Sequence, residues 1–210
     1  MSLTRLIGLL AVSVYAADTG LDGLLTKVED HYNRTKTLQV LFTEQYTPPG
    51  GLRRTESGTL LLRKPARMRG EYSQPKGKLF ISDGKFLWPY TPDDNRAEKM
   101  PLKDTEDLRA PLAFLLGKLH FTKEFRNLQA LPEGNLTRVT AEPKSGDLPY
   151  YSMVEFVVNP EGLIQELRAT GSDHSVLDFT FSQERDDPPL SSSLFQFQLP
   201  PGAQLEEAAQ

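Results

Sequence analysis

Apolar and polar residues alternate along residues 57–92, and this pattern constrains the fold more than any other feature of the sequence. Successive side chains of a β-strand point to opposite faces of its sheet, so the alternation predicts strands with one apolar and one charged face. The apolar parity carries Leu60, Leu62, Met68 and Tyr72, and the charged parity carries Arg63, Arg67, Arg69 and Glu71.

Turn residues divide the same stretch into short strands. Gly77, the Asp83-Gly84 pair and Pro92 interrupt the alternation. An Asp-Gly pair between two apolar runs is a strong hairpin signal, because glycine adopts the positive φ that a tight turn needs. The stretch therefore predicts three or four consecutive antiparallel strands, wet on the outer face and apolar on the inner face.

Further strand signals extend this pattern into a large sheet. They cover residues 38–46, 96–100, 135–141, 150–158, 163–170 and 174–183, with a last short strand within residues 195–202 and a frayed end from Glu206. About ten strands without a βαβ rhythm predict a mainly β, α+β domain. An apolar face of that size must curl and be covered, so we expect an incomplete β-barrel plugged by helices.

Two segments predict helices that supply this cover. Residues 18–37 carry apolar side chains at helical spacing, and residues 104–119 form a capped, very apolar segment that Pro111 kinks or restarts. Each helix either packs on the sheet as an ordinary layer or forms a lid over its apolar face. The sequence leaves both alternatives open.

Composition supports one globular domain of ordinary size. The chain has 210 residues, of which 38% are hydrophobic and 25% charged, so a sizeable core is expected and extensive disorder is not. The formal net charge is −4, which excludes non-specific nucleic-acid binding through clustered Lys and Arg. There is no cysteine, which excludes disulfides, thiolate metal sites and a lipid-modified N-terminal Cys.

The N-terminus has the pattern of a secretory signal peptide. Arg5 precedes a short apolar run, and Val14-Tyr15-Ala16 favours cleavage before Ala17. The run is shorter than the roughly 20 residues of a membrane-spanning helix. We expect a signal peptide over residues 1–16 and a single domain over 17–210, exported without a membrane anchor. The alternative is a short N-terminal helix that stays attached.

Signatures of enzyme chemistry are missing from the sequence. His31, His120 and His174 do not stand at a metal-ligand spacing, and neither a G-x-S-x-G motif nor a phosphate loop occurs. Asp173 beside His174 fits an exposed turn better than a catalytic pair. We therefore predict no catalytic residue, no metal ligand and no cofactor.

Several short motifs resemble one protein family in their order and spacing. The chain reads G-x-L-x-L-x-[K/R]-P from Gly58 and x-S-D-G-K-x-L-W-x-Y-x-P up to Pro92. L-x-x-x-F-T-E-Q precedes them at residues 38–45, and F-x-F-x-x-P-x-G closes the domain at residues 195–202. Together these motifs are similar to the outer-membrane lipoprotein carrier (LolA-type) family, over nearly the whole mature chain.

The resemblance implies a fold and a function. The fold would be a curved antiparallel sheet forming an incomplete β-barrel, with helices as a lid over an apolar cavity. The protein would be a monomeric, non-enzymatic periplasmic carrier. Its partners would be acylated lipoproteins, an inner-membrane lipoprotein-releasing ABC transporter and an outer-membrane lipoprotein receptor.

Strand parity and the resemblance together select candidate lipid-binding residues. Those on the sheet are Phe42, Leu60, Leu62, Met68 and Tyr72, with Trp88 as an aromatic candidate, and those under the lid are Leu112, Leu115 and Leu116. For each of them, ordinary core packing is the alternative to contact with lipid.

Lys64 departs from the family pattern. The family usually has Arg before the Pro of the opening motif, where it hydrogen-bonds backbone carbonyls of the lid, and this chain has Lys64 there. Lys64 shares the apolar parity, so we expect it to point inward and act as a lid latch. An ammonium lacks the planar fork of a guanidinium, so such a latch would be looser. The alternative is that Lys64 extends to the rim and latches nothing.

Two other functions compete with the carrier hypothesis. One is a lipid- or lipoprotein-sensing binding module on the same fold, without transfer activity. The other is an exported hydrolase with an unrecognised carboxylate pair. Burial-shifted acids in a polar pocket would favour the hydrolase, whereas a dry apolar cavity would favour the carrier.

Overall fold

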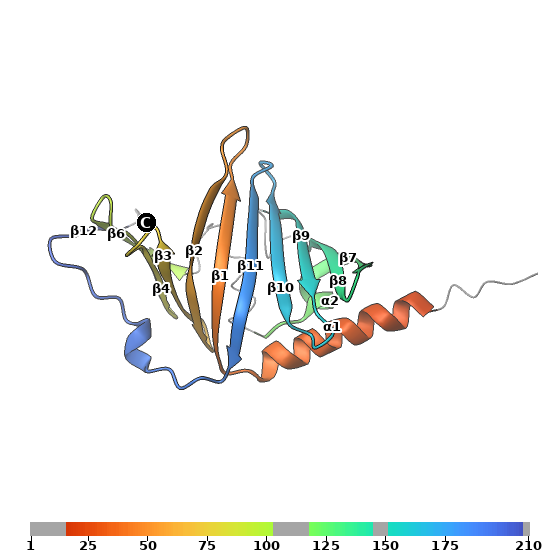
Figure 1. Cartoon of the computed structure of the whole chain (residues 1–210). Helices are drawn as coiled ribbons and strands as arrows, with labels where there is room; N and C mark the ends of the chain where they lie inside the picture. The colour runs from red at the N-terminus through yellow and green to blue at the C-terminus, as the bar shows by residue number, and fades with distance from the viewer. Residues whose placement is uncertain (1–15, 103–117, 145–150, 208–210) are drawn as a thin grey trace, which may run out of the picture.

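One curved 12-stranded sheet forms the body of the protein (Figure 1). The computed structural model describes residues 16–102, 118–144 and 151–207. The strand order is β12-β6-β5-β4-β3-β2-β1-β11-β10-β9-β8-β7, and every neighbouring pair is antiparallel except the parallel pair β12–β6. The sheet is open, with β7 and β12 at its two edges. The predicted fold class, a mainly β domain built on a curved antiparallel sheet, is confirmed.

Short connections join most of the strands. The strands are β1 (Thr37–Thr47), β2 (Arg54–Arg63), β3 (Arg67–Gln74), β4 (Leu79–Asp83), β5 (Phe86–Thr91), β6 (Arg96–Pro101), β7 (Phe125–Glu133), β8 (Leu136–Pro143), β9 (Tyr151–Val158), β10 (Ile164–Gly171), β11 (Val176–Asp186) and β12 (Gln204–Glu207). The helical elements are α1 (Ala16–Arg34), the single turn α2 (Phe121–Glu124) and the 3-10 turn η3 (Ser192–Phe195).

The alternating stretch folds as predicted. Residues 57–92 fall in β2, β3, β4 and β5, which pair consecutively as antiparallel neighbours. Gly84 makes the β4–β5 turn with a φ of 97°, and the Asp83 carboxylate accepts backbone N–H groups of Lys85 and Phe86, both at 2.8 Å. The same carboxylate accepts the Trp88 indole N–H at 3.2 Å, so one side chain fixes the whole hairpin.

The core lies on the inner face of the sheet and is sealed at one end by α1 (Figure 1). α1 contributes Leu25, Val28 and Tyr32 to the same buried cluster as the inner-face side chains of the strands. The predicted helix over residues 18–37 is present, but it ends at Arg34 because Thr37 already pairs with β2.

The C-terminal segment differs from the sequence prediction. Residues 195–202 were expected to form a strand, but Phe195 ends the turn η3 and the strand comes later, as β12. Glu206 and Glu207 belong to β12, so the predicted fraying is wrong for these two residues, and the rest of that prediction lies outside the described residues. The packing of two aromatic side chains explains why this segment is not a strand. Phe195 is buried, with 1% of its surface exposed, and the Phe197 ring stacks on Trp88 with ring centroids 5.3 Å apart.

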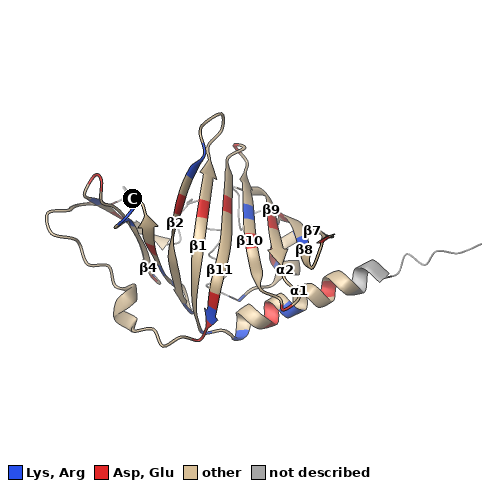
Figure 2. Cartoon of the chain, viewed as in Figure 1, with Lys and Arg blue, Asp and Glu red and all other residues tan. Residues whose placement is uncertain are grey.

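This segment also covers a face that the sequence predicted to be wet. We call residues 188–199 the C-terminal strap. Arg63 donates to the Leu190 carbonyl at 3.1 Å, and Arg69 donates to the Leu194 carbonyl at 3.0 Å, so the strap satisfies charged side chains of the outer face. Figure 2 shows that residues of both charge signs occur on β2, β10 and β11.

Some predictions fall outside the described residues, and one strand was missed. The proposed signal peptide, apart from Ala16, lies outside the described residues. Residues 104–117 of the predicted apolar helix lie outside them as well. β7 was not among the predicted strands. Its pairing with β8 is interrupted between Arg126 and Gln129, where Asn127 has a positive φ, so its side chains do not alternate regularly between the two faces. None of the described helices combines the length and apolar character needed to cross a bilayer.

We predict that Phe195→Ala destabilises the protein by about 3–5 kcal/mol, the usual cost of truncating a buried aromatic side chain. Urea unfolding followed by far-UV circular dichroism measures this loss. Leu199→Ala is the matched control on the same strap, because Leu199 is 45% exposed, and it should change stability by less than about 0.5 kcal/mol. Equal losses in both variants would contradict the assigned packing of the strap.

We predict that Asp83 makes stability depend on pH. Burial raises the pKa of Asp83, but hydrogen bonds from Phe86, Lys85 and Trp88 outweigh it and leave the pKa below its ordinary value. A carboxyl with a lowered folded-state pKa stabilises the fold above its unfolded pKa of about 3.9, and this contribution disappears as the pH falls through the folded pKa. The stability difference between wild type and Asp83→Asn should therefore be largest at neutral pH and shrink below about pH 4. A difference that stays constant down to acid unfolding would refute this.

Candidate functional site

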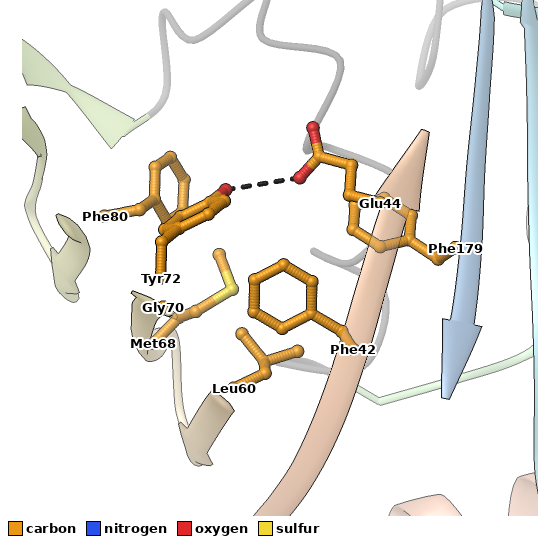
Figure 3. A pocket seen from close by; sticks show the side chains of 8 residues that line it. All are labelled: Phe42, Glu44, Leu60, Met68, Gly70, Tyr72, Phe80 and Phe179. Carbon is orange, nitrogen blue, oxygen red and sulfur yellow. Dashed lines mark hydrogen bonds between the residues drawn. The ribbon is translucent and has the colours of Figure 1, made fainter. Parts of the chain in front are cut away.

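An apolar pocket opens on the inner face between β1–β4 and β11 (Figure 3). Its side chains pack closely and leave about 10 Å³ of free volume, roughly the room that one water molecule needs. Strand register assembles it, because Leu60 pairs with Gly70 and Gly70 pairs with Phe80 across β2, β3 and β4. The lining residues are Phe42, Glu44, Leu60, Met68, Gly70, Tyr72, Phe80 and Phe179.

Aromatic rings and one methionine form most of the pocket wall. Phe42 lies edge-on to Tyr72, with ring centroids 5.2 Å apart, and tilted against Phe179 at 6.2 Å. Met68 points between these rings in Figure 3. An unbranched thioether repacks easily around different shapes, and Gly70 leaves the floor without a side chain. The wall is therefore suited to apolar ligands without a fixed outline.

Polar side chains gather at one end of the pocket. Tyr72 donates its hydroxyl hydrogen to the Glu44 carboxylate at 3.2 Å (Figure 3). Lys78 lies 4.5 Å from the centre of the Tyr72 ring and forms an ion pair with Glu56. Glu44 follows Phe42 by two positions in β1, so the polar end faces the β1–β2 loop. A ligand with an apolar tail and a polar head matches this distribution.

The structure brings most of the described candidate residues together. Phe42, Leu60, Met68 and Tyr72 line the pocket, and Leu62 is buried in the adjoining core. Leu112, Leu115 and Leu116 lie outside the described residues. Sequence reasoning missed the lining residues Glu44, Gly70, Phe80 and Phe179. Strand parity would have found Gly70, which lies between Met68 and Tyr72 in alternation, whereas Phe179 required the long-range pairing of β11 with β1.

Trp88 is a correction to the predicted site. It pairs with Ile81 across β4 and β5, whereas Leu87 pairs with Ser82 and belongs to the inner-face core. Trp88 therefore faces the other side of the sheet, where it stacks on Phe197 of the C-terminal strap. It does not line the apolar pocket, and the alternative of ordinary packing holds.

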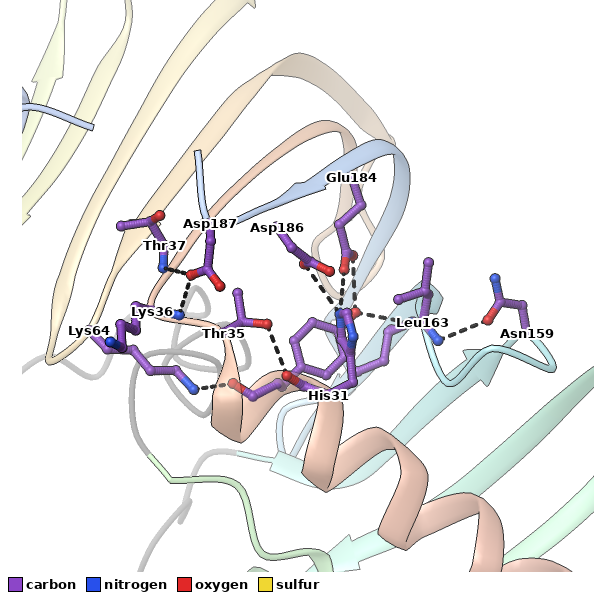
Figure 4. Close-up of polar contacts among 12 residues, drawn as sticks. His31, Thr35, Lys36, Thr37, Lys64, Asn159, Leu163, Glu184, Asp186 and Asp187 are labelled. Atoms are coloured by element: carbon purple, nitrogen blue, oxygen red, sulfur yellow. Dashed lines mark hydrogen bonds and ion pairs between the residues drawn. The ribbon is translucent and has the colours of Figure 1, made fainter. Parts of the chain in front are cut away.

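Lys64 points toward α1, as its parity predicted. Its Nζ donates a hydrogen bond to the backbone carbonyl of Tyr32 in the last turn of α1 (Figure 4). Burial lowers the pKa of Lys64. The carbonyls of a last helical turn lack helical partners, so an ammonium at this position satisfies one of them.

Polar contacts also tie the last turn of α1 to the far strands. Tyr32 donates its hydroxyl hydrogen to Glu184 of β11 at 3.0 Å and accepts the Ile164 N–H of β10 at 3.0 Å. Burial, followed by the negative charge of Glu184, raises the pKa of Tyr32. Asn33 exchanges two hydrogen bonds with the backbone of Leu119, at 2.7 and 2.8 Å. One end of the apolar interior is therefore closed by a helix that hydrogen bonds hold in place.

An open curved sheet with an apolar inner pocket and a polar rim defines a class of binding protein for lipid-like ligands. The family model described as "Outer membrane lipoprotein carrier protein LolA" matches residues 33–198 of this chain. The chain belongs to this family. It is a family of carriers and not of enzymes, so the prediction of a non-enzymatic protein is confirmed.

Individual relatives agree with this membership. An outer-membrane lipoprotein carrier protein of Methylibium petroleiphilum is 32% identical over 173 residues, which cover 81% of this chain and 82% of the relative. One of Chromobacterium violaceum is 28% identical over 175 residues, which cover 81% of each chain. The crystal structure of an uncharacterised conserved protein from Thermus thermophilus aligns with a TM-score of 0.52 at 14% identity, covers 90% of this chain and 99% of that one, and shows the shared fold.

Proposed function

We propose that this protein shields the acyl chains of lipoproteins in its apolar pocket and carries them through the periplasm. The observation that carries the proposal is the pocket itself, whose wall is aliphatic and aromatic and whose polar groups gather at one end. Burying an acyl chain is worth about 0.8 kcal/mol per CH₂, so a lipid anchor crosses water only when it is covered. Related proteins of this family are named lipoprotein carriers, which supports the same cargo here.

Loading requires the pocket to widen. Its free volume of about 10 Å³ is far below the usual range of ligand pockets, about 300–1,000 Å³. The described conformation therefore fits an unloaded carrier whose interior side chains pack against each other. Met68 and the Phe42 ring contact their neighbours through carbon and sulfur atoms, so moving them costs mainly dispersion contacts. Moving Tyr72 also breaks its hydrogen bond to Glu44.

Transfer needs a donor and an acceptor. We propose that an inner-membrane lipoprotein-releasing ABC transporter loads the protein and that an outer-membrane lipoprotein receptor unloads it. The absence of covalent chemistry supports reversible exchange, since the only acid that lines the described pocket is Glu44. A second, polar pocket holds Glu166 and Asp178, but these carboxylates are paired with Arg138 and Arg168, which is an arrangement of ion pairs rather than of a catalytic acid pair. A sensing module would bind the same lipids but would not pass them on.

We predict that Gly70→Leu blocks acyl binding. A Cβ at Gly70 would meet Phe80 and Tyr72 at 3.6 Å, an ordinary van der Waals distance, so the first added atom fits and the rest of the side chain fills the pocket. Displacement of a fluorescent fatty-acid probe by a triacylated lipopeptide measures binding. We expect strong displacement with wild type and at least an approximately tenfold weaker probe affinity in the variant, equivalent to about 1.4 kcal/mol.

Gly23→Leu is the matched control. Gly23 is exposed on α1 with no atom within 4 Å of an added Cβ, so the same substitution there should leave probe binding unchanged. Failure of the lipopeptide to displace the probe from wild type would overturn the proposed cargo. Displacement without transfer to receptor-containing vesicles would favour the sensing module.

We predict that Lys64 acts as the latch of α1. Lys64→Ala removes a charge-assisted hydrogen bond, which contributes about 1.5–3 kcal/mol, so bound probe should leave about tenfold faster or more. Stopped-flow release and hydrogen exchange at the last turn of α1 measure the effect. Lys64→Arg should retain slow release, and Lys36→Ala, at a neighbouring exposed lysine, should behave as wild type. Unchanged release and exchange in Lys64→Ala would show that Lys64 latches nothing.

A further inference from the structure

Three side chains from distant parts of the chain converge where α1 meets β11 (Figure 4). His31 Nε2 lies 2.9 Å from an oxygen of Glu184 and 3.4 Å from an oxygen of Asp186. All three ligand atoms lie within 4.8 Å of one another. Glu184 and Asp186 stand two positions apart in β11, so both carboxylates project from the same side of the strand toward the imidazole.

The spacing of these atoms suits a divalent metal ion. Zinc binds imidazole nitrogen and carboxylate oxygen at about 2.0–2.2 Å in tetrahedral geometry, which places two ligand atoms roughly 3.3–3.6 Å apart. The separation between His31 and Asp186 already has this value. Glu184 needs to recede from the imidazole by about half an ångström, which a small side-chain rotation supplies. Three protein ligands also leave a fourth position for water.

The surroundings hold two of the ligands and leave the third accessible. The side chains of His31 and Glu184 are 6% and 11% exposed, whereas that of Asp186 is 47% exposed, so an ion can enter from the Asp186 side. Tyr32 donates its hydroxyl hydrogen to the second oxygen of Glu184 at 3.0 Å, and its ring lies edge-on to the His31 ring at 4.7 Å. Outer contacts of this kind orient ligands and raise metal affinity in known sites.

The charge around the three residues favours a cation. Two carboxylates, those of Glu184 and Asp186, face the single imidazole of His31. The Lys64 ammonium is directed to the Tyr32 carbonyl. An ion with two positive charges would balance both carboxylates without any change in the backbone.

We propose that His31, Glu184 and Asp186 form a binding site for Zn²⁺ at the junction of α1 and β11. The mixed set of one nitrogen and two oxygen donors suits zinc better than calcium or magnesium, which take all-oxygen sites. Because the ligands come from a helix and a strand, the ion would cross-link the last turn of α1 to the sheet. The ligands lie at the closed end of the interior and not in the apolar pocket, so Zn²⁺ binding can be measured without cargo.

Isothermal titration of tag-free, chelator-stripped protein with ZnCl₂ at pH 7 tests the proposal. We expect one saturable site per chain, together with a rise in the melting temperature of the full chain, because an ion that binds only the folded state stabilises it. Co²⁺ titration should give visible absorption bands typical of a coordination number below six. Metal affinity should fall as the pH falls, since protons compete for imidazole and carboxylates.

Variants separate this site from weak surface binding. Asp186→Asn changes an exposed side chain and should preserve the fold while weakening Zn²⁺ at least about tenfold, and Glu184→Gln should weaken it similarly. His120→Gln is the matched control. His120 lies 3.8 Å from the carboxylate of Glu29 on α1, so it is also a histidine next to an acid, but it does not belong to the proposed site. The proposal is overturned if wild type shows no saturable binding. It is equally overturned if Asp186→Asn and Glu184→Gln bind as wild type does, or if only His120→Gln loses binding.

Discussion

The apolar inner face of an open sheet is the constraint on which the rest of this structure depends. Strands β1 to β5 and β7 to β11 contribute side chains to one apolar cluster, and such a surface persists in water only when it is covered. α1 closes one end with Leu25, Val28 and Tyr32, and the aromatic side chains of the strands fill much of the rest. On the outer face, the C-terminal strap covers β3 and β4 through η3. Curvature, helix position and strap all follow from the need to bury these faces.

Packing is uneven along the sheet, and this unevenness supports carriage. In the half that contains β7 to β9, Phe121, Phe125 and Phe156 pack against each other with ring centroids 5.3–6.2 Å apart. In the half that contains β1 to β4, Gly70 leaves a gap and Met68 supplies an adaptable side chain. The two halves therefore differ in packing, and the proposed ligand site lies in the half with the adaptable side chains. Hydrogen bonds hold the end of α1. Because such bonds depend on geometry, a small displacement of the helix breaks them, which suits a helix that opens and closes one end of the interior.

Sequence reasoning succeeded where local pattern determines structure. Alternation assigned Leu60, Met68 and Tyr72 to the inner face correctly, because parity within a strand is independent of its neighbours. The Asp83-Gly84 turn was equally local. Sequence reasoning failed where segments that are far apart in the chain contact each other. The strap appeared as a strand because F-x-F alternates, although Phe195 and Phe197 are placed by contacts with β3 to β5. Trp88 shared the motif of the inner strands but points outward, because its partner residues lie on the outer face.

By itself the sequence determined the class of fold, the inner parity of β2 and β3, the direction of Lys64 and the family. These follow from periodicity, turn chemistry and motif order, which are properties of neighbouring residues. Only the tertiary structure decided that Phe179 and Gly70 share a pocket with Phe42. It also brought His31 to Glu184 across 153 positions of the chain. Such meetings depend on the pairing of β11 with β1 and on where α1 ends, and a one-dimensional pattern does not encode the distance between segments so far apart.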